Sequence, residues 1–300
     1  MHPGNASEKV AQGGRLGKRF AGALGIMAHW ISKPRLLRSL RKLEGHTVAA
    51  QDGDIGKVGD FLVDDEQWVV RYLVVQSGSL LHRHHVLITP VAFDEVDWEA
   101  QRFRLNLTKK QVEDSPSVDA DKPVSRQHER EHFLYYGYPF YWGYAGLWGP
   151  GALPGELAEQ PLLKPEHHAR FDEAQGESHL RSVSELHGYA VEGSDDTIGH
   201  VKDFIVDEES WQIRYLVLDT SKLWFGESVL LPPRLATNVS FNDRTVSVDL
   251  ERRAVRESPP WDPSQEITPA YEVALFEHYG QFSRPQPPAE AADAGTSHHA

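Results

Sequence analysis

Hydrophobic and polar positions alternate over several short stretches between residues 41 and 107, and turn residues separate these stretches. Residues 47–50, 55–64, 68–75, 86–89 and 102–107 are each predicted to form a strand. Residues 68–75 are apolar at nearly every position apart from Arg71, which is typical of a central strand buried on both faces. Several short strands without a long intervening helix predict a small antiparallel sheet or barrel.

The same pattern occurs again 143 residues further along the chain, with an offset that stays constant from Leu43 and Leu186 to Pro116 and Pro259. A repeat of this length indicates a tandem duplication. The sequence therefore predicts a mainly β protein of two tandem small antiparallel β-barrels, each followed by short helices. The signature residues shared by the copies are Gly56, Asp60, Asp64, Trp68, Arg71 and Tyr72 in the first, and Gly199, Asp203, Asp207, Trp211, Arg214 and Tyr215 in the second.

Two short helices are predicted after the last strand of each copy. The first stops at a Ser-Pro pair, because proline cannot continue a helix, and the second ends at a capping glycine. Within the second helix of the first copy, Phe133 and Tyr136 are three positions apart and are expected to pack on the module through one face. The boundary residues are Thr108, Pro116 and Gly137 in the first copy and Glu251, Pro259 and Gly280 in the second.

The repeats divide the chain into five predicted regions. We expect the two modules to pack on each other with pseudo-symmetry, because duplicated modules share complementary faces. The regions are a basic flexible arm (1–40), a first barrel with its trailing helix (41–137), an aromatic and glycine-rich, then polar, linker (138–180), a second barrel with its trailing helix (181–280), and a disordered tail (281–300).

Charge is distributed unevenly along the chain. The net charge of the 300 residues is −13, but residues 1–42 carry nine Lys and Arg against one Glu, a net charge of +8 that leaves −21 for the rest. The acidic body argues against a nucleic-acid partner. The chain has no cysteine, which excludes disulfides and thiol chemistry.

The basic arm is predicted to contact an anionic membrane surface through residues 1–42, with residues 20–31 as an apolar docking segment. That segment is too short to span a bilayer, which takes about 20 residues. The alternatives are a loose terminus that covers part of the first barrel, or a gene start placed too far upstream. We expect a cytoplasmic protein, either free or at the inner face of the membrane.

Residues 138–155 are rich in aromatic residues and glycine. One interpretation is a surface for a protein partner, for lipid headgroups or for self-association, since aromatic side chains dominate interface energetics. The other is a linker whose rings fold back onto the barrels. The candidate residues are Tyr138, Phe140, Tyr141, Trp142, Tyr144 and Trp148.

The repeated motif resembles the PRC-barrel family over residues 43–137 and 186–280. The motif is Leu-x-Gly, then Ile-Gly-x-Val-x-Asp-Phe followed by a hydrophobic residue and Val-Asp, then Trp-x-hydrophobic-Arg-Tyr-Leu-Val. This small β-barrel is found in the cytoplasmic part of the photosynthetic reaction-centre H subunit and in the C-terminal part of the ribosome-maturation factor RimM. The resemblance implies a non-catalytic interaction module. Unlike the H subunit, this chain is predicted to have two barrels and no membrane span.

The repeated carboxylates have two possible roles. Asp60 and Asp64, with their counterparts Asp203 and Asp207, could form an acidic surface that relays protons, as the resemblance to the reaction-centre subunit implies. Alternatively, they bond to turn residues and pair with Arg71 and its counterpart. A carboxylate beside a guanidinium is a poor base near neutral pH, so we assign no catalytic residue.

His82, His84 and His85 form the densest histidine cluster and are weak candidates for a metal site. The second copy lacks the cluster, and its spacing matches no known metal motif. The chain has no P-loop and no dinucleotide-binding glycine motif, so no cofactor is predicted.

Three functions are compatible with these observations. The first is a non-enzymatic scaffold whose barrels bind a protein partner or a second copy of the chain. The second is a reaction-centre-H-like auxiliary that supports electron or proton transfer in a membrane complex. The third is a metal-dependent enzyme that uses the histidine cluster.

Overall fold

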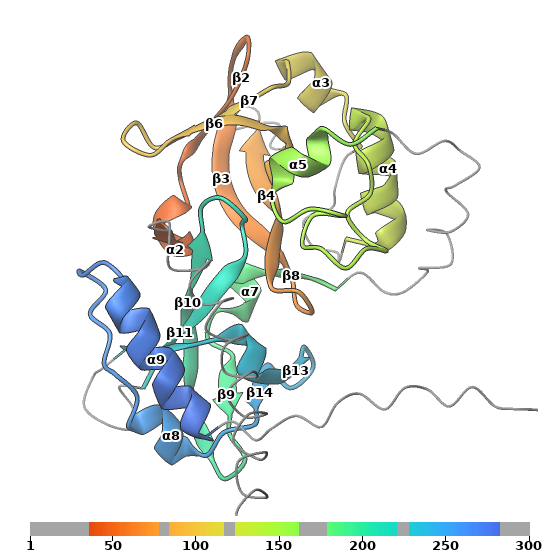
Figure 1. Cartoon of the computed structure of the whole chain (residues 1–300). Coiled ribbons are helices and arrows are strands. Elements are labelled where there is room, and N and C mark those ends of the chain that lie inside the picture. The colour runs from red at the N-terminus through yellow and green to blue at the C-terminus, as the bar shows by residue number, and fades with distance from the viewer. Residues whose placement is uncertain (1–35, 78–83, 117–123, 162–178, 221–227, 283–300) are drawn as a thin grey trace, which may run out of the picture.

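The computed structural model describes residues 36–77, 84–116, 124–161, 179–220 and 228–282. This part of the chain is mainly β, with two sheets of seven strands each and a few short helices (Figure 1). The predicted fold class is confirmed. One sheet comes mostly from each copy of the repeat.

The first module begins with a short strand and helix and continues as a sheet followed by helices. In chain order its elements are β1 (Leu37–Ser39), α2 (Leu40–Leu43), β2 (Thr47–Ala50), β3 (Gly53–Asp64), β4 (Val69–Ser77), β5 (His84–Ile88), the 3₁₀ turn η1 (Pro90–Ala92), β6 (Phe93–Asp97), β7 (Arg102–Leu105), α3 (Lys109–Glu113), α4 (Arg126–Tyr136) and α5 (Pro154–Ala158).

The second module repeats this order up to its last helix. Its elements are β8 (Leu180–Ser182), α7 (Val183–Leu186), β9 (Ala190–Glu192), β10 (Thr197–Asp207), β11 (Ile213–Asp219), β12 (Ser228–Leu231), the 3₁₀ turn η2 (Pro233–Leu235), β13 (Ala236–Ser240), β14 (Thr245–Val248), α8 (Arg252–Arg256) and α9 (Pro269–Phe282).

Both sheets have the same strand order. The first runs β5-β4-β3-β2-β7-β6 and the second β12-β11-β10-β9-β14-β13. Neighbouring strands are antiparallel except for one pair in each sheet, β2 with β7 and β9 with β14, which are parallel. The expectation of purely antiparallel sheets therefore misses these pairs, because residue alternation does not specify the direction of the neighbouring strand.

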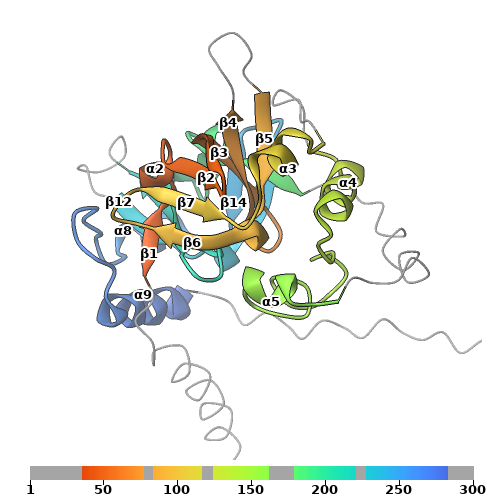
Figure 2. The same cartoon turned by 90° about the horizontal axis from the view of Figure 1, so that it is seen from above.

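The seventh strand of each sheet comes from the other module. β1 pairs with β10 of the second sheet, and β8 pairs with β3 of the first. Residues 37–39, predicted to belong to the flexible arm, and residue 180, predicted to belong to the linker, are paired in regular strands. This reciprocal exchange gives the two modules a pseudo-twofold arrangement, in which α4 and α5 lie on one side of the molecule and α9 on the opposite side (Figures 1 and 2).

Two tryptophans lie at the centre of this arrangement. The backbone N–H of Val70 donates to the carbonyl of Trp211 at 2.8 Å, and that of Ile213 donates to the carbonyl of Trp68 at 2.7 Å. The prediction that the strand begins at residue 68 is wrong, because Trp68 and Trp211 have φ angles of 54° and 60° and sit in the turns before β4 and β11. Bulky residues seldom adopt this conformation, and the reciprocal hydrogen bonds help to hold them in it.

The helices after each sheet end differently. Ser125 caps the start of α4. Gly137, at φ 73°, caps its end, and this glycine cap was predicted. The matching prediction for Gly280 is wrong, because α9 continues through this residue to Phe282. Phe133 of α4 is fully buried against the first module.

None of the helices in the described ranges is long and apolar enough to cross a membrane.

Candidate functional site

The Asp60 and Asp203 carboxylates lie where the two modules meet. Asp203 accepts a hydrogen bond from the hydroxyl of Ser39 at 2.5 Å and another from the backbone N–H of Arg41 at 3.1 Å. Asp60 makes the equivalent contact with the hydroxyl of Ser182 at 2.5 Å. Each carboxylate therefore binds the exchanged strand of the other module and the first turn of the short helix that follows it.

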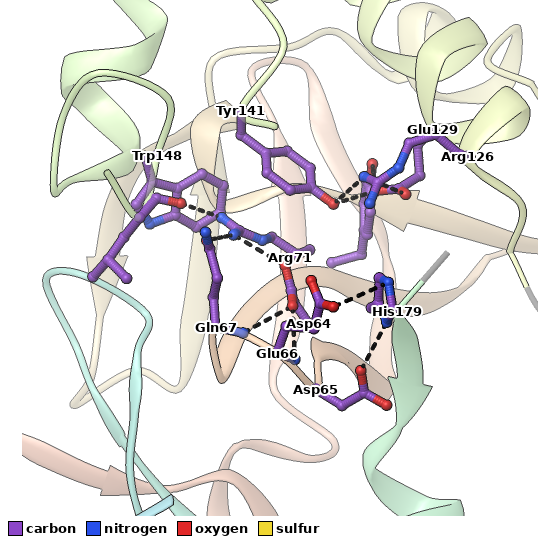
Figure 3. A network of polar contacts seen from close by, with 12 residues as sticks. Asp64, Asp65, Glu66, Gln67, Arg71, Arg126, Glu129, Tyr141, Trp148 and His179 are labelled. Atoms are coloured by element: carbon purple, nitrogen blue, oxygen red, sulfur yellow. Dashed lines mark hydrogen bonds and ion pairs between the residues drawn. The ribbon is translucent and has the colours of Figure 1, made fainter. Parts of the chain in front are cut away.

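Ion pairs reinforce the exchanged strands in the same reciprocal manner. Arg38 pairs with Glu208 at 2.9 Å, and Arg181 pairs with Asp65 at 2.8 Å. His179 lies just before β8, close enough to Asp65 for a pair at 3.4 Å (Figure 3). The charges around these strands thus join the two modules to each other.

The carboxylate–serine contact makes a measurable contribution to stability. We expect Asp203→Ala to lower the free energy of unfolding by about 2–3 kcal/mol, because charged hydrogen bonds contribute about 1.5–3 kcal/mol. Urea titration would measure the loss. The control is Asp54→Ala, which removes a largely exposed ion pair with Arg102 and should cost under about 1 kcal/mol. Equal losses in the two variants would contradict a role for Asp203 in joining the modules.

Arg71 lies at the centre of a second polar cluster in the first module (Figure 3). Its side chain is 1% exposed. The guanidinium donates to a carboxylate oxygen of Asp64 at 3.2 Å, to the side-chain oxygen of Gln67 at 2.6 Å and to the backbone carbonyl of Leu147 at 2.5 Å. It also lies 3.8 Å from the centre of the Tyr141 ring, a cation–π distance. Arg71 therefore fixes the aromatic stretch on the first sheet.

The aromatic segment, which we define as residues 138–151, covers this cluster. Tyr144 is 37% exposed, and the other five rings singled out from the sequence are buried. The indole N–H of Trp148 donates to the backbone carbonyl of Ser210 at 2.7 Å, so the segment also contacts the second module. These five rings are buried because the segment folds back onto the modules, as in the second interpretation of the sequence. A partner surface built on these residues stays a prediction.

Glu129 on α4 is fully buried beneath the same segment. It accepts hydrogen bonds from the hydroxyl of Tyr141 at 2.5 Å and from that of Tyr72 at 3.3 Å, and it pairs with Arg126 at 2.9 Å. Burial raises the pKa of the Glu129 carboxyl, and the adjacent Arg126 guanidinium opposes this rise. Burial and the neighbouring carboxyl raise the pKa of the Tyr72 and Tyr141 hydroxyls.

The second module has corresponding residues, and no aromatic segment covers them among the residues that the structure describes. The hydroxyl of Tyr215 donates to Glu272 at 2.8 Å, as Tyr72 does to Glu129 in the first module. Phe276 is 42% exposed, although its counterpart Phe133 is fully buried. The guanidinium of Arg234 stacks on the Phe276 ring at 4.9 Å.

A cleft of about 530 Å³ opens between the modules. The residues along it are Asp65, Glu66, Trp68, His179, Arg181, Pro233, Arg234, Ala236, Thr237, Asn238 and Val239. Burial raises the pKa of Asp65, and Arg181 and His179 oppose this rise. The acidic and basic side chains of the cleft partly neutralise each other through the ion pairs described above.

Gly56 and Gly199 are required by close approach of the backbone. A Cβ on Gly56 would lie 2.0 Å from the carbonyl oxygen of Gln76, and one on Gly199 would lie 2.7 Å from that of Asp219. Both glycines adjoin a register shift between paired strands, as is common for glycine within a strand.

The histidine cluster is described only in part. His82 lies outside the described residues, and His84 and His85 are successive residues of β5 that pair with Ser77 and Gln76. Within the ranges that the structure covers, no three His, Asp or Glu residues are grouped to hold a metal ion. A metal site here stays an untested hypothesis.

Sequence reasoning missed the exchanged strands, although the repeat contained a signal for them. Leu37, Arg38 and Ser39 recur as Leu180, Arg181 and Ser182 at the same offset of 143 residues. Extending the repeat upstream of residue 43 would have revealed this identity. The residues next to each tripeptide in the sequence do not show that it pairs with the other module.

The fold and contacts define a mainly β protein of two reciprocally paired modules. Residues 179–253 match the family model of the PRC-barrel domain. The matched range begins just before β8 and ends within α8, so it spans the sheet of the second module and its preceding strand. No curated protein matches the chain. The match indicates an interaction module rather than a particular activity.

Proposed function

We propose that this chain is a non-catalytic protein-interaction or scaffold protein built from two PRC-barrel modules. We propose that the first module is also a PRC-barrel module. It repeats the matched second module at the 143-residue offset, and it has the same strand order and the reciprocal contacts. One observation carries the proposal. The repeated Asp60 and Asp203 carboxylates bind across the interface and join the modules into one unit.

A joined pair of modules presents two related faces in a fixed orientation. Such a unit suits a protein that holds partners relative to one another, because pre-organised surfaces lose less entropy on binding. The basic residues 1–42 would add electrostatic attraction to an anionic membrane surface. A reaction-centre-H-like role is the special case in which the partner is a pigment or quinone complex.

The proposal predicts that the native protein is part of a complex whose mass exceeds the 33.8 kDa of the chain alone. Native extract would be fractionated at low and high salt, and the chain followed by mass spectrometry together with any stoichiometric partner. Membrane association lost at high salt would support the basic arm as an electrostatic tether, since salt screens exposed charges. Co-purification with pigment or quinone would support the reaction-centre-H-like role.

Two results would argue against a scaffold. One is a chain that migrates alone at every salt concentration. The other is an enzymatic activity that survives purification and is lost on Asp60→Asn or Asp203→Asn while circular dichroism shows an intact fold.

A further inference from the structure

We propose that the second module binds in trans a glycine-rich partner segment that carries tyrosine and tryptophan. The binding surface, called the open face below, consists of Tyr215, Arg234, Glu272 and Phe276. This inference rests on the proposed interaction function and specifies the surface and the chemistry of its partner.

The first module shows what covers an equivalent surface. There, Phe133 is fully buried, and the rings of Tyr138, Tyr141 and Trp142 lie 6.2, 5.6 and 5.6 Å from its own. All three belong to the aromatic segment that follows α4. The repeat therefore contains its own example of a bound aromatic segment.

The open face retains two of the residues of α4 that this segment contacts, although the counterpart of Arg126 is Pro269. Glu272 and Phe276 lie 143 positions after Glu129 and Phe133 and are presented by α9 in place of α4. The hydroxyl of Tyr215 is the one described donor to the Glu272 carboxylate, whereas the Glu129 carboxylate also accepts a hydrogen bond from Tyr141. The second module thus has the acceptor and the apolar ring in place without the tyrosine that uses them in the first.

The stretch that follows α9 differs in composition from the stretch that follows α4. Residues 283–300 contain no Phe, Tyr or Trp, whereas the corresponding stretch after α4 contains the whole aromatic segment. Among the described residues, Phe276 of α9 has 42% of its surface exposed. Burial of this ring beside the Arg234 guanidinium would contribute to the binding of a partner.

The contacts in the first module define the partner's chemistry. A tyrosine ring would pack on Phe276 and donate its hydroxyl to Glu272, as Tyr141 does to Glu129. A second aromatic ring could stack on the guanidinium of Arg234, which already lies over Phe276. Glycines are needed because the segment turns tightly, with Gly143 and Gly149 at φ 80° and 65°.

The test uses the full-length chain and a fluorescent synthetic peptide with the sequence of residues 138–158. Fluorescence anisotropy would measure binding as the protein concentration is raised. The first module should not compete for the peptide, because its own tethered segment has a high effective concentration. We expect saturable binding that Phe276→Asp weakens at least about tenfold, as loss of an anchoring ring does.

Two matched controls distinguish binding at the open face from nonspecific hydrophobic binding. Phe241→Asp removes another exposed ring of the second module, 49% exposed, and should leave peptide affinity unchanged. A peptide with phenylalanine at the position of Tyr141 should bind several-fold more weakly, because Glu272 then receives no second hydroxyl.

Each other outcome overturns the inference. Peptide binding that is absent, or equal in the wild type and Phe276→Asp, would show that the open face does not take such a segment. Sedimentation showing a dimer that Phe276→Asp dissociates would assign the face to a second copy of the chain. If the peptide fails but the native protein still travels with a stoichiometric partner, the proposed function stands and its surface lies elsewhere.

Discussion

Replacing Glu129 with leucine is expected to lower the free energy of unfolding by about 3–5 kcal/mol, because the change removes one partner from a buried charged network. Arg126 would lose its ion pair, and the hydroxyls of Tyr72 and Tyr141 would lose their acceptor in a site without solvent. Urea titration followed by circular dichroism would measure the loss.

The duplicated module supplies the matched control for this variant. Glu272→Leu makes the same substitution at a half-buried position that accepts one described hydrogen bond, from Tyr215. Its expected cost is about 1 kcal/mol, the net contribution of an ordinary hydrogen bond. Glu129→Gln, which keeps an acceptor for Tyr141, should fall between the two leucine variants. Similar losses at Glu129 and Glu272 would show that the buried network adds nothing to the first module.

Stability should also fall as the pH drops from about 6.5 to about 4, because of His132. This residue of α4 is fully buried, and burial lowers its pKa from 6.5 to about 4. The folded state therefore favours neutral histidine, whereas the unfolded chain takes up a proton below pH 6.5. The contribution is fully present above that pH and decreases by roughly 3 kcal/mol as the pH falls to about 4, where it levels off.

The surroundings of His132 explain why the folded protein loses stability, rather than gains it, as the pH drops. Its Nε2 lies 2.9 Å from the backbone carbonyl of Leu87, so it carries the proton of the neutral ring and donates it. The rings of Tyr72 and Tyr136 lie 5.2 and 4.9 Å away, and Nδ1 has no hydrogen-bond partner among the described residues. His128, on the same helix, disfavours a second positive charge.

The second module again provides the comparison. Leu275 occupies the position equivalent to His132 and is buried. His132→Leu should therefore fold and remove the histidine component of the pH dependence, so that the difference in unfolding free energy between wild type and variant changes with pH between 6.5 and 4. A difference that stays constant over this range would refute the assignment.

The two halves of the molecule are related by sequence but differ in what covers them. Arg71 is buried under the aromatic segment, whereas the matching face of the second module keeps Phe276 exposed. A duplicated fold can thus bind one segment within the chain and retain a second face for another molecule. The proposed partner surface rests on this asymmetry rather than on the repeat itself.

The sequence by itself determined the duplication, the mainly β class and most strand positions. Alternation shows which side of a strand is buried, and the capping residues Ser125 and Gly137 act on their own helix, so these features can be predicted locally. Repetition of the pattern 143 residues later also established that two like modules are present.

Only the tertiary structure decided which elements bury one another. The tripeptide at Leu37 could have joined its own sheet, yet it pairs with β10, because the Asp203 carboxylate and the Glu208 side chain that bind it belong to the other module. Burial of the rings of the aromatic segment likewise depends on Arg71, which is 76 residues away from Leu147 in the sequence. Local patterns specify that a side chain should be buried, whereas contacts between distant residues specify what buries it.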